Sequence, residues 1–295
     1  MNTILVVDDA KVNLEVVEAL LSQNYHVLTA LDATRAFELL KQHRVDLILL
    51  DIFMPSIDGF GVCRLLKNSK KTREIPIIFL TAADDEDSIE RAYVIGGSDY
   101  VTKPFRPKEL KARVNREIQL QKLQQELMEL ATTDPMTQLY NRRYFGTISQ
   151  ELYANAVSKE QRLVLMILDI DKFKLINDSY GHSVGDKVII HFANQLVAYA
   201  QRDDIVARFG GEEFVVLFSN TTLEKAHLLA QRIRKNIETT PLLLPTKQKI
   251  HFTVSIGVIE VDTQDEESIE DAIIRADDAL YRAKNSGRNQ VIISY

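Results

Sequence analysis

Two glycines followed by two glutamates are the residues of this chain that most clearly indicate chemistry. The run Arg-Phe-Gly-Gly-Glu-Glu-Phe occupies residues 208–214, between apolar runs at 205–209 and 214–218. Glycine accepts the positive φ angles of a tight turn, so the pattern predicts a β-hairpin. Adjacent carboxylates such as Glu212 and Glu213 repel each other unless a cation or a proton lies nearby. The turn therefore indicates a metal–nucleotide site, although a solvated acidic turn would explain the motif if it stood alone.

Three further stretches accompany this turn. They read Asp-Ile-Asp-Lys-Phe-Lys-Leu-Ile-Asn-Asp at 169–178, Gly-His-Ser-Val-Gly-Asp at 181–186 and Tyr-Arg-Ala-Lys-Asn-Ser-Gly-Arg-Asn at 281–289. In order and spacing, the four stretches resemble the GGDEF family of diguanylate cyclases, with the signature in its GGEEF form. The resemblance implies a palm-like nucleotidyl cyclase fold and an enzyme that condenses two GTP into cyclic di-GMP and two pyrophosphates.

Such a reaction needs a divalent cation, Mg²⁺ or Mn²⁺, because the triphosphate charge must be neutralised and the attacking hydroxyl made more acidic. Asp169 ends an expected strand, so Asp169 and Glu212 can reach one cleft. The resemblance implies that Asp169, the Ile170 carbonyl and Glu212 hold the metal. Glu213 is then the general base or a metal-assisting group, and Asp171 is expected to be structural.

Two cationic residues, Lys284 and Arg288, stand four apart at the end of an expected helix. Guanidinium and ammonium groups donate well to phosphate oxygens, although cations at a helix C-terminus also complement the helix dipole. The resemblance favours phosphate binding, and it places Phe173 and Lys174 in a turn that contacts the terminal phosphates.

The resemblance implies that Asn177 and Asp186 select the nucleotide base. A carboxylate that faces the N1–H and 2-amino donors of guanine discriminates against adenine, because the wrong base leaves polar groups unpaired. The sequence therefore predicts GTP as substrate in preference to ATP.

The segment at 201–204 departs from the family pattern. Many members carry Arg-x-x-Asp before the signature as an inhibitory site for the product, whereas this chain has Gln201 and Asp204 in those positions. A neutral amide cannot replace a bidentate arginine–phosphate contact, and Arg202 is one residue out of register. We expect a degenerate inhibitory site and weak or absent product inhibition.

In the first half of the chain, apolar runs of four to six residues alternate with helical patterns, which is typical of buried parallel strands in a doubly wound α/β fold. Polar residues stand at the strand ends, where ligands gather in such sheets. Three carboxylates there can bind Mg²⁺ beside a phosphoryl group, which a lysine and a threonine can contact. Helix capping would explain one of these acids but not the whole set. The residues are Asp8, Asp9, Asp51, Thr81 and Lys103.

This half resembles the receiver domains of two-component response regulators over its full length. The resemblance implies that Asp51 is phosphorylated by a cognate histidine kinase or phosphotransfer protein. It further implies that the Phe53 carbonyl is a metal ligand and that Thr81, Tyr100 and Lys103 form the switch. Lys103-Pro104 is a candidate cis peptide bond.

The expected organisation is a (βα)5 receiver at 1–106, a helical coiled-coil linker at 107–131 that continues the last receiver helix, and a cyclase domain at 132–295. The linker lacks glycine, has one proline at its start, and places leucines at 120, 123, 127 and 130, as in a coiled-coil seam. One half-site binds one GTP, so the family works as a homodimer whose two half-sites meet. Phosphorylation would shift that assembly equilibrium.

The second half shows the mixed pattern of an α+β domain. Asp134-Pro135 is expected to begin its first helix, as an N-cap followed by proline. Strands, helices and one hairpin in this order favour a sheet with helices on one side. The expected elements are strands at 163–170, 252–260 and 291–294 and helices at 186–200, 223–239 and 268–285.

Composition restricts the partners and the compartment. The net charge of −6 gives no general reason to bind nucleic acid or an anionic membrane, and no apolar run approaches the length of a membrane span. The beginning of the chain lacks the features of a signal peptide, and one cysteine cannot form an intrachain disulfide. We expect a cytoplasmic protein.

The sequence weighs against three other functions. A degenerate GGDEF module could sense GTP or act as a scaffold without turnover, but the acidic and basic residues named above are intact. A cyclic dinucleotide receptor is disfavoured by Gln201. A DNA-binding regulator is disfavoured because no helix-turn-helix pattern follows the receiver and the chain is acidic.

Overall fold

The computed structural model describes residues 1–55, 57–82, 86–263 and 268–294. The chain divides into two compact units, Met1–Glu126 and Leu127–Tyr295, which are described separately. One continuous helix, α5 (Pro107–Thr132), crosses the division between them.

The first unit contains a five-stranded sheet in the order β2-β1-β3-β4-β5, in which every neighbouring pair is parallel. Helices α2, α3 and α4 cover one face, and α1 and the first part of α5 cover the other. This confirms the doubly wound (βα)5 fold. The elements are β1 (Thr3–Val7), α1 (Lys11–Leu21), β2 (His26–Ala30), α2 (Ala33–Gln42), β3 (Leu47–Asp51), α3 (Gly59–Asn68), β4 (Ile77–Ala82), α4 (Glu86–Val94) and β5 (Asp99–Lys103).

The second unit contains a six-stranded mixed sheet in the order β13-β12-β7-β9-β8-β6. Its long central strands, β12, β7 and β9, are antiparallel neighbours. The elements are β6 (Tyr140–Asn141), α6 (Arg142–Ser158), β7 (Leu163–Ile170), α7 (Phe173–Tyr180), α8 (His182–Tyr199), β8 (Ile205–Gly210), β9 (Glu213–Ser219), α9 (Leu223–Thr239), β10 (Leu242–Leu243), β11 (Lys249–Ile250), β12 (Val254–Val261), α10 (Ile269–Asn285) and β13 (Val291–Ser294).

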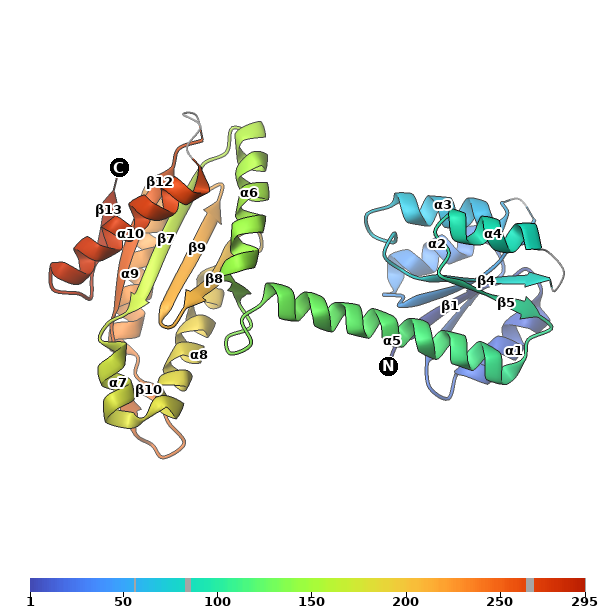
Figure 1. The fold of residues 1–295 in the computed structure, drawn as a ribbon, viewed down its shortest axis with the longest axis horizontal. Coiled ribbons are helices and arrows are strands. Elements are labelled where there is room, and N and C mark those ends of the chain that lie inside the picture. Colours follow the sequence, from blue (N-terminus) through green and yellow to red (C-terminus); the bar gives the residue numbers. More distant parts are fainter. Residues whose placement is uncertain (56, 83–85, 264–267, 295) are drawn as a thin grey trace. The chain divides into compact units, whose positions relative to one another are not determined.

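Helices cover both faces of this sheet, so the expectation of helices on one side was wrong. Residues at alternate positions of β7 enter two separate cores: one packs against α7, α8 and α9, and the other against α6 and α10. Figure 1 shows α6 and α10 on one face and α8 and α9 on the other. Every position of β7 is buried, as expected for a strand between two helical layers.

Asp134 does not begin a helix, which corrects a second expectation. Residues 135–137 form a turn instead, and the Asp134 carboxylate accepts hydrogen bonds from the amide and hydroxyl of Thr137. The helix begins at Arg142, where the Asn141 side chain accepts from the Tyr144 amide as N-cap. Aspartate before proline serves a turn as readily as a helix end, because its side chain can bond amides two or three residues ahead.

A methyl group added at Gly257 of β12 is expected to destabilise the second unit severely. An ideal Cβ there would overlap the Ala276 carbonyl oxygen and lie 2.5 Å from the Leu280 amide nitrogen, both in the backbone of α10. Because backbone cannot rotate away, Gly257→Ala should cost about 3 kcal/mol or more in urea unfolding. Gly146→Ala in α6 is the matched control and should be neutral or slightly stabilising, because among the described residues no atom beyond the adjoining helix backbone lies within 4 Å of the added Cβ. Equal stability of the two variants would contradict this packing.

Candidate active site and acidic cluster

Strand pairing brings three carboxylate-bearing residues to one end of the second sheet. Asp169 near the end of β7 pairs with Glu213 at the start of β9, and the Ile170 amide donates to the Glu212 carbonyl at 3.4 Å. The turn between β8 and β9 is closed by Gly210 (φ 149°) and Gly211 (φ 52°), which adopt the positive φ angles expected of the glycine pair.

A lysine from a distant helix lies against this group of acids. The Lys284 Nζ atom of α10 is 2.9 Å from Asp169 Oδ2, and the Asp169 side chain is only 8% exposed. Burial raises the pKa of Asp169 to about 6; the Lys284 ammonium opposes that shift, and the charges of Glu212 and Glu213 add to it. Carboxylate and carbonyl oxygens are the donors that a hard divalent cation prefers, and Asp169, the Ile170 carbonyl and Glu212 would be the ligands.

Asp171 holds the neighbouring loop in place, in keeping with its expected structural role. Its buried carboxylate accepts hydrogen bonds from Thr253 Oγ1 at 2.7 Å and Ser255 Oγ at 2.6 Å, both on or beside β12. It also accepts from the Asn289 amide at 2.9 Å. Because Asn289 follows Arg288, this carboxylate fixes the loop that carries one of the expected phosphate-binding cations.

The expected phosphate contacts are divided between two places. Lys284 lies in the group of acids, whereas Arg288 lines a cavity of about 410 Å³ together with Lys172. Lys172 adopts a left-handed conformation (φ 54°) immediately before α7, which begins with the buried Phe173 and the exposed Lys174. The Leu175 amide donates to the Lys172 carbonyl at 2.9 Å, whereas the first two amides of α7, those of Phe173 and Lys174, precede any intrahelical partner and could bind an anion.

The two residues expected to read the base lie on neighbouring helices. Asn177 is on α7 and Asp186 is on α8, and the single residue Gly181 joins these helices. Within the described part of the chain, neither side chain takes part in a hydrogen bond or an ion pair. Their polar groups are therefore open to a ligand.

Arg208 is a site residue to which the sequence analysis assigned no role. From β8 its guanidinium donates to Asp134 Oδ1 at 3.0 Å and Oδ2 at 3.2 Å, and to the Gly211 carbonyl at 2.7 Å. The arginine therefore ties the acidic hairpin to the turn that follows α5. An arginine within an apolar strand run was the available signal, but its partner Asp134 is far away in sequence.

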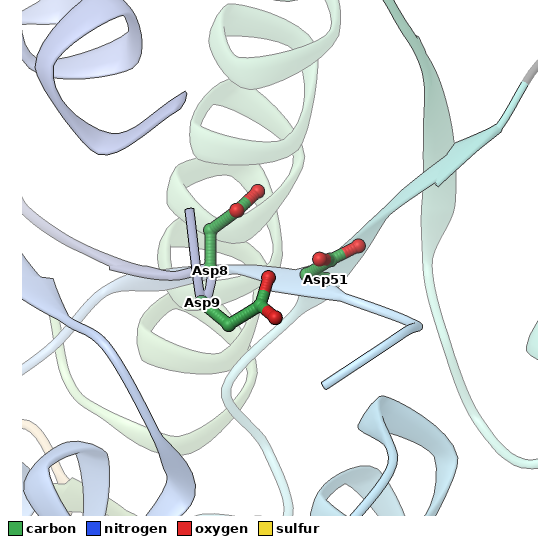
Figure 2. Close-up of side chains that lie close together, drawn as sticks. All are labelled: Asp8, Asp9 and Asp51. Carbon is green, nitrogen blue, oxygen red and sulfur yellow. The ribbon is translucent and has the colours of Figure 1, made fainter. Parts of the chain in front are cut away.

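The first unit holds a second group of acids at the ends of β1 and β3. Carboxylate oxygens of Asp8, Asp9 and Asp51 lie within 4.8 Å of one another, and Figure 2 shows the three side chains gathered at these strand ends. Lys103 Nζ bridges the buried pair, at 2.7 Å from Asp8 and 2.8 Å from Asp51. Burial raises the pKa of Asp51, and the bond from Lys103 opposes that shift. Three oxygen donors around one space fit Mg²⁺.

The other expected switch residues lie on neighbouring strands. Thr81 is buried in β4, and Tyr100 in β5 packs its ring 5.2 Å from the Arg113 guanidinium of α5. Phe53 follows β3 with an exposed side chain. The Lys103-Pro104 peptide bond is cis, as the sequence predicted.

The departure at 201–204 has a structural counterpart. The Asp204 carboxylate accepts hydrogen bonds from the amides of Gln201 at 2.7 Å and Ser219 at 3.1 Å. Burial raises the pKa of Asp204. This side chain thus closes its own loop, and Arg202 is exposed one position away from Gln201.

Comparison with known proteins assigns both units. Residues 131–290 match the family described as "Diguanylate cyclase, GGDEF domain", and residues 4–115 match "Response regulator receiver domain". The chain belongs to the GGDEF family of diguanylate cyclases. Its first unit is a response regulator receiver domain.

Two curated relatives of this GGDEF protein span one or both domains. "Response regulator PleD" of Caulobacter vibrioides is 33% identical over 298 residues, which cover 98% of this chain and 65% of PleD. "Diguanylate cyclase A" of Treponema denticola is 42% identical over 172 residues, which cover 57% of this chain and 46% of that protein. The chain thus spans less than two thirds of the length of either relative.

A solved structure supports the fold of the second domain. The coiled coil and GGDEF domain of DgcB from Caulobacter crescentus, in complex with c-di-GMP, aligns with a TM-score of 0.58 at 31% identity. The alignment covers 63% of this chain and 96% of that one. In the described ranges, no helix has both the length and the apolar character needed to cross a bilayer.

Removal of the Lys284 charge is expected to strengthen metal binding in the absence of nucleotide. The ammonium and a divalent cation compete for Asp169, so Lys284→Met should bind Mn²⁺ roughly three- to tenfold more tightly, measured by calorimetry at pH 8. Lys174→Met is the matched control, because exposed Lys174 forms no ion pair with a described residue. Unchanged or weaker Mn²⁺ binding by Lys284→Met would show that no competition exists.

Loss of Arg208 is expected to loosen the acidic hairpin. Arg208→Ala removes the donors to the Gly211 carbonyl, so hydrogen exchange of the amides at 211–214 should accelerate at least tenfold. Arg202 is exposed and lies outside the turn, so Arg202→Ala should leave those rates unchanged. Equal protection in both variants would mean that strand pairing alone fixes the hairpin.

Proposed function

We propose that this protein is a phosphorylation-regulated diguanylate cyclase that condenses two GTP into cyclic di-GMP and two pyrophosphates. The observation that carries the proposal is the juxtaposition of Asp169, Glu212 and Glu213 at one sheet end, with Lys284 against Asp169. The comparisons support it, because one relative is named a diguanylate cyclase and the similar structure, that of DgcB, was solved in complex with c-di-GMP.

The residues of the cleft divide the chemistry among them. A Mg²⁺ or Mn²⁺ ion bound by Asp169, the Ile170 carbonyl and Glu212 would neutralise phosphate charge and make the attacking 3′-hydroxyl more acidic. Glu213 lies beside Asp169 and serves as general base or as a further support for the metal. Lys284, released from Asp169, donates to phosphate oxygens together with Arg288.

GTP is held at its two ends by separate elements. The amides and side chains at the start of α7, with Phe173 and Lys174, face the terminal phosphates. Asn177 and Asp186 bind the guanine edge, because their polar groups have no partner within the described chain and lie on adjacent helices. A carboxylate at 186 accepts from the N1–H and 2-amino groups that adenine lacks.

One such cleft cannot close a cyclic dinucleotide, so the active species is a homodimer. Each 3′-hydroxyl must meet the α-phosphate held by the other copy. The seam of α5 supports pairing with a second copy, because its leucines are exposed and repeat at intervals of three and four. They are Leu120, Leu123, Leu127 and Leu130.

The receiver domain supplies the control. A histidine kinase or phosphotransfer protein phosphorylates Asp51, and the new phosphoryl group takes over the Lys103 ammonium that now bridges Asp8 and Asp51. Strand β5, which carries Lys103, is joined to α5 by the ion pairs of Asp99 with Arg113 at 2.7 Å and Arg116 at 2.8 Å. A change at the acidic cluster therefore reaches the helix that carries the seam.

The decisive experiment is GTP turnover by the purified chain with Mg²⁺, with and without beryllofluoride, followed by chromatographic detection of cyclic di-GMP. We expect product from the wild-type chain, stimulation by beryllofluoride, and no stimulation in Asp51→Asn. Glu213→Gln should lower kcat at least 100-fold while the chain stays folded, and exposed Asp203→Asn should retain full activity. GTP binding without turnover would instead identify a GTP-sensing or scaffolding module.

Product inhibition is expected to be weak or absent, because Asp204 is engaged by backbone amides and Gln201 offers no guanidinium. Titration of cyclic di-GMP into the chain, followed by calorimetry, measures this directly. Gln201→Arg restores the missing donor and should tighten binding at least tenfold. Submicromolar product binding that depends on Asp204 in the wild-type chain would contradict the expectation.

A further inference from the structure

A glycine on α8 lies where an added side chain would displace the neighbouring Asn177 side chain. An ideal Cβ at Gly185 would overlap the Asn177 Oδ1 atom, and it would lie 3.0 Å from Asn177 Cγ and 3.1 Å from Phe173 Cζ. Gly146, the other glycine inside a long helix of this domain, has open space at the same position. Glycine inside a helix costs about 1 kcal/mol relative to alanine, so its presence in α8 calls for a compensating role.

The connection between the two helices fixes this contact. Gly181 is the only residue between α7 and α8; its amide donates to the Asn177 carbonyl at 2.8 Å, and its own carbonyl accepts from the Gly185 amide at 3.2 Å. Gly185 is buried, and it immediately precedes Asp186 in α8. The Asn177 side chain therefore contacts α8 at Gly185, the residue next to Asp186.

We propose that Gly185 is a positioning residue for purine recognition: the space left by its missing side chain holds the Asn177 amide in the orientation that reads guanine. The proposal rests on the function proposed above and names a residue that sets its base specificity. Packing must fix this orientation, because within the described chain no hydrogen bond restrains the Asn177 side chain. A Cβ at 185 would force Oδ1 outward until the two atoms were at least 3.0 Å apart. Such a displacement breaks hydrogen bonds that depend on distance and angle.

The effect of a side chain at position 185 on the preference for GTP over ATP depends on which nucleotide contacts remain. Phosphate binding involves α10 and the start of α7, where the new methyl group would lie 3.1 Å from the ring tip of Phe173, so we expect the phosphate contacts to persist. Asp186 keeps its contact with guanine, while the contact through Asn177 is lost. We therefore expect affinity for guanine nucleotides to fall and affinity for adenine nucleotides to change little, because the proposed contact is made to guanine.

The test is calorimetric binding of α,β-methylene GTP and α,β-methylene ATP to the full chain with Mg²⁺. Gly185→Ala is expected to weaken the GTP analogue about tenfold and to leave the ATP analogue within twofold. Asn177→Ala should show the same change, and Gly185→Ala in the Asn177→Ala background should add nothing, because the truncated residue no longer meets the new methyl group. Gly146→Ala is the matched control and should bind both analogues as the wild type does.

Each outcome decides between the proposals. If Gly185→Ala preserves the GTP preference, or if its effect adds to that of Asn177→Ala, the positioning role is refuted. If Gly185→Ala fails to fold, the double variant must fold again and bind like Asn177→Ala; continued unfolding would show a purely structural glycine. A wild-type chain without preference for the GTP analogue would overturn the proposed function itself, whatever Gly185 does.

Discussion

The buried Asp169 carboxylate, paired with a lysine from elsewhere in the chain, is the interaction on which the candidate site of the second domain depends. Asp169 is buried and faces Glu213 across the β7–β9 pair, so its charge is costly in isolation. Lys284 offsets that cost only because α10 packs closely on β12, where Gly257 permits contact with the helix backbone. The fold therefore holds an acidic site in which the Asp169 charge is paired with an internal cation.

In the receiver domain, too, a lysine lies against buried carboxylates, although the residues come from different elements. Asp8 and Asp51 end parallel strands side by side, and Lys103 from a third strand lies between their carboxylates. In both domains the lysine reaches the acids from a distant segment. Under the proposed function, an incoming phosphoryl group or metal ion would change the partner of that lysine. Such an event would then change the contacts between secondary-structure elements.

Much of this arrangement was predictable from residue patterns. The parallel strands of the receiver, the acids at their ends, the hairpin at Gly210-Gly211 and the strand that ends near Asp169 all follow from local rules of periodicity and turn chemistry. The unbroken apolar run of β7 also implied burial on both faces, a signal the expectation of one helical layer overlooked. The turn at Asp134 was misjudged, because its side chain bonds Thr137 and Arg208, and only the first partner is local.

By itself the sequence determined which residue types could carry out chemistry and which elements would hold them, because strand and turn preferences are set by near neighbours. The sequence also determined the family, because the order and spacing of the motifs can be recognised without a structure. Only the tertiary structure decided that Lys284 meets Asp169, that Arg208 joins the hairpin to Asp134, and that Gly185 makes room for Asn177. These contacts join segments far apart in the chain or depend on the packing of two helices, and no local preference encodes such distances.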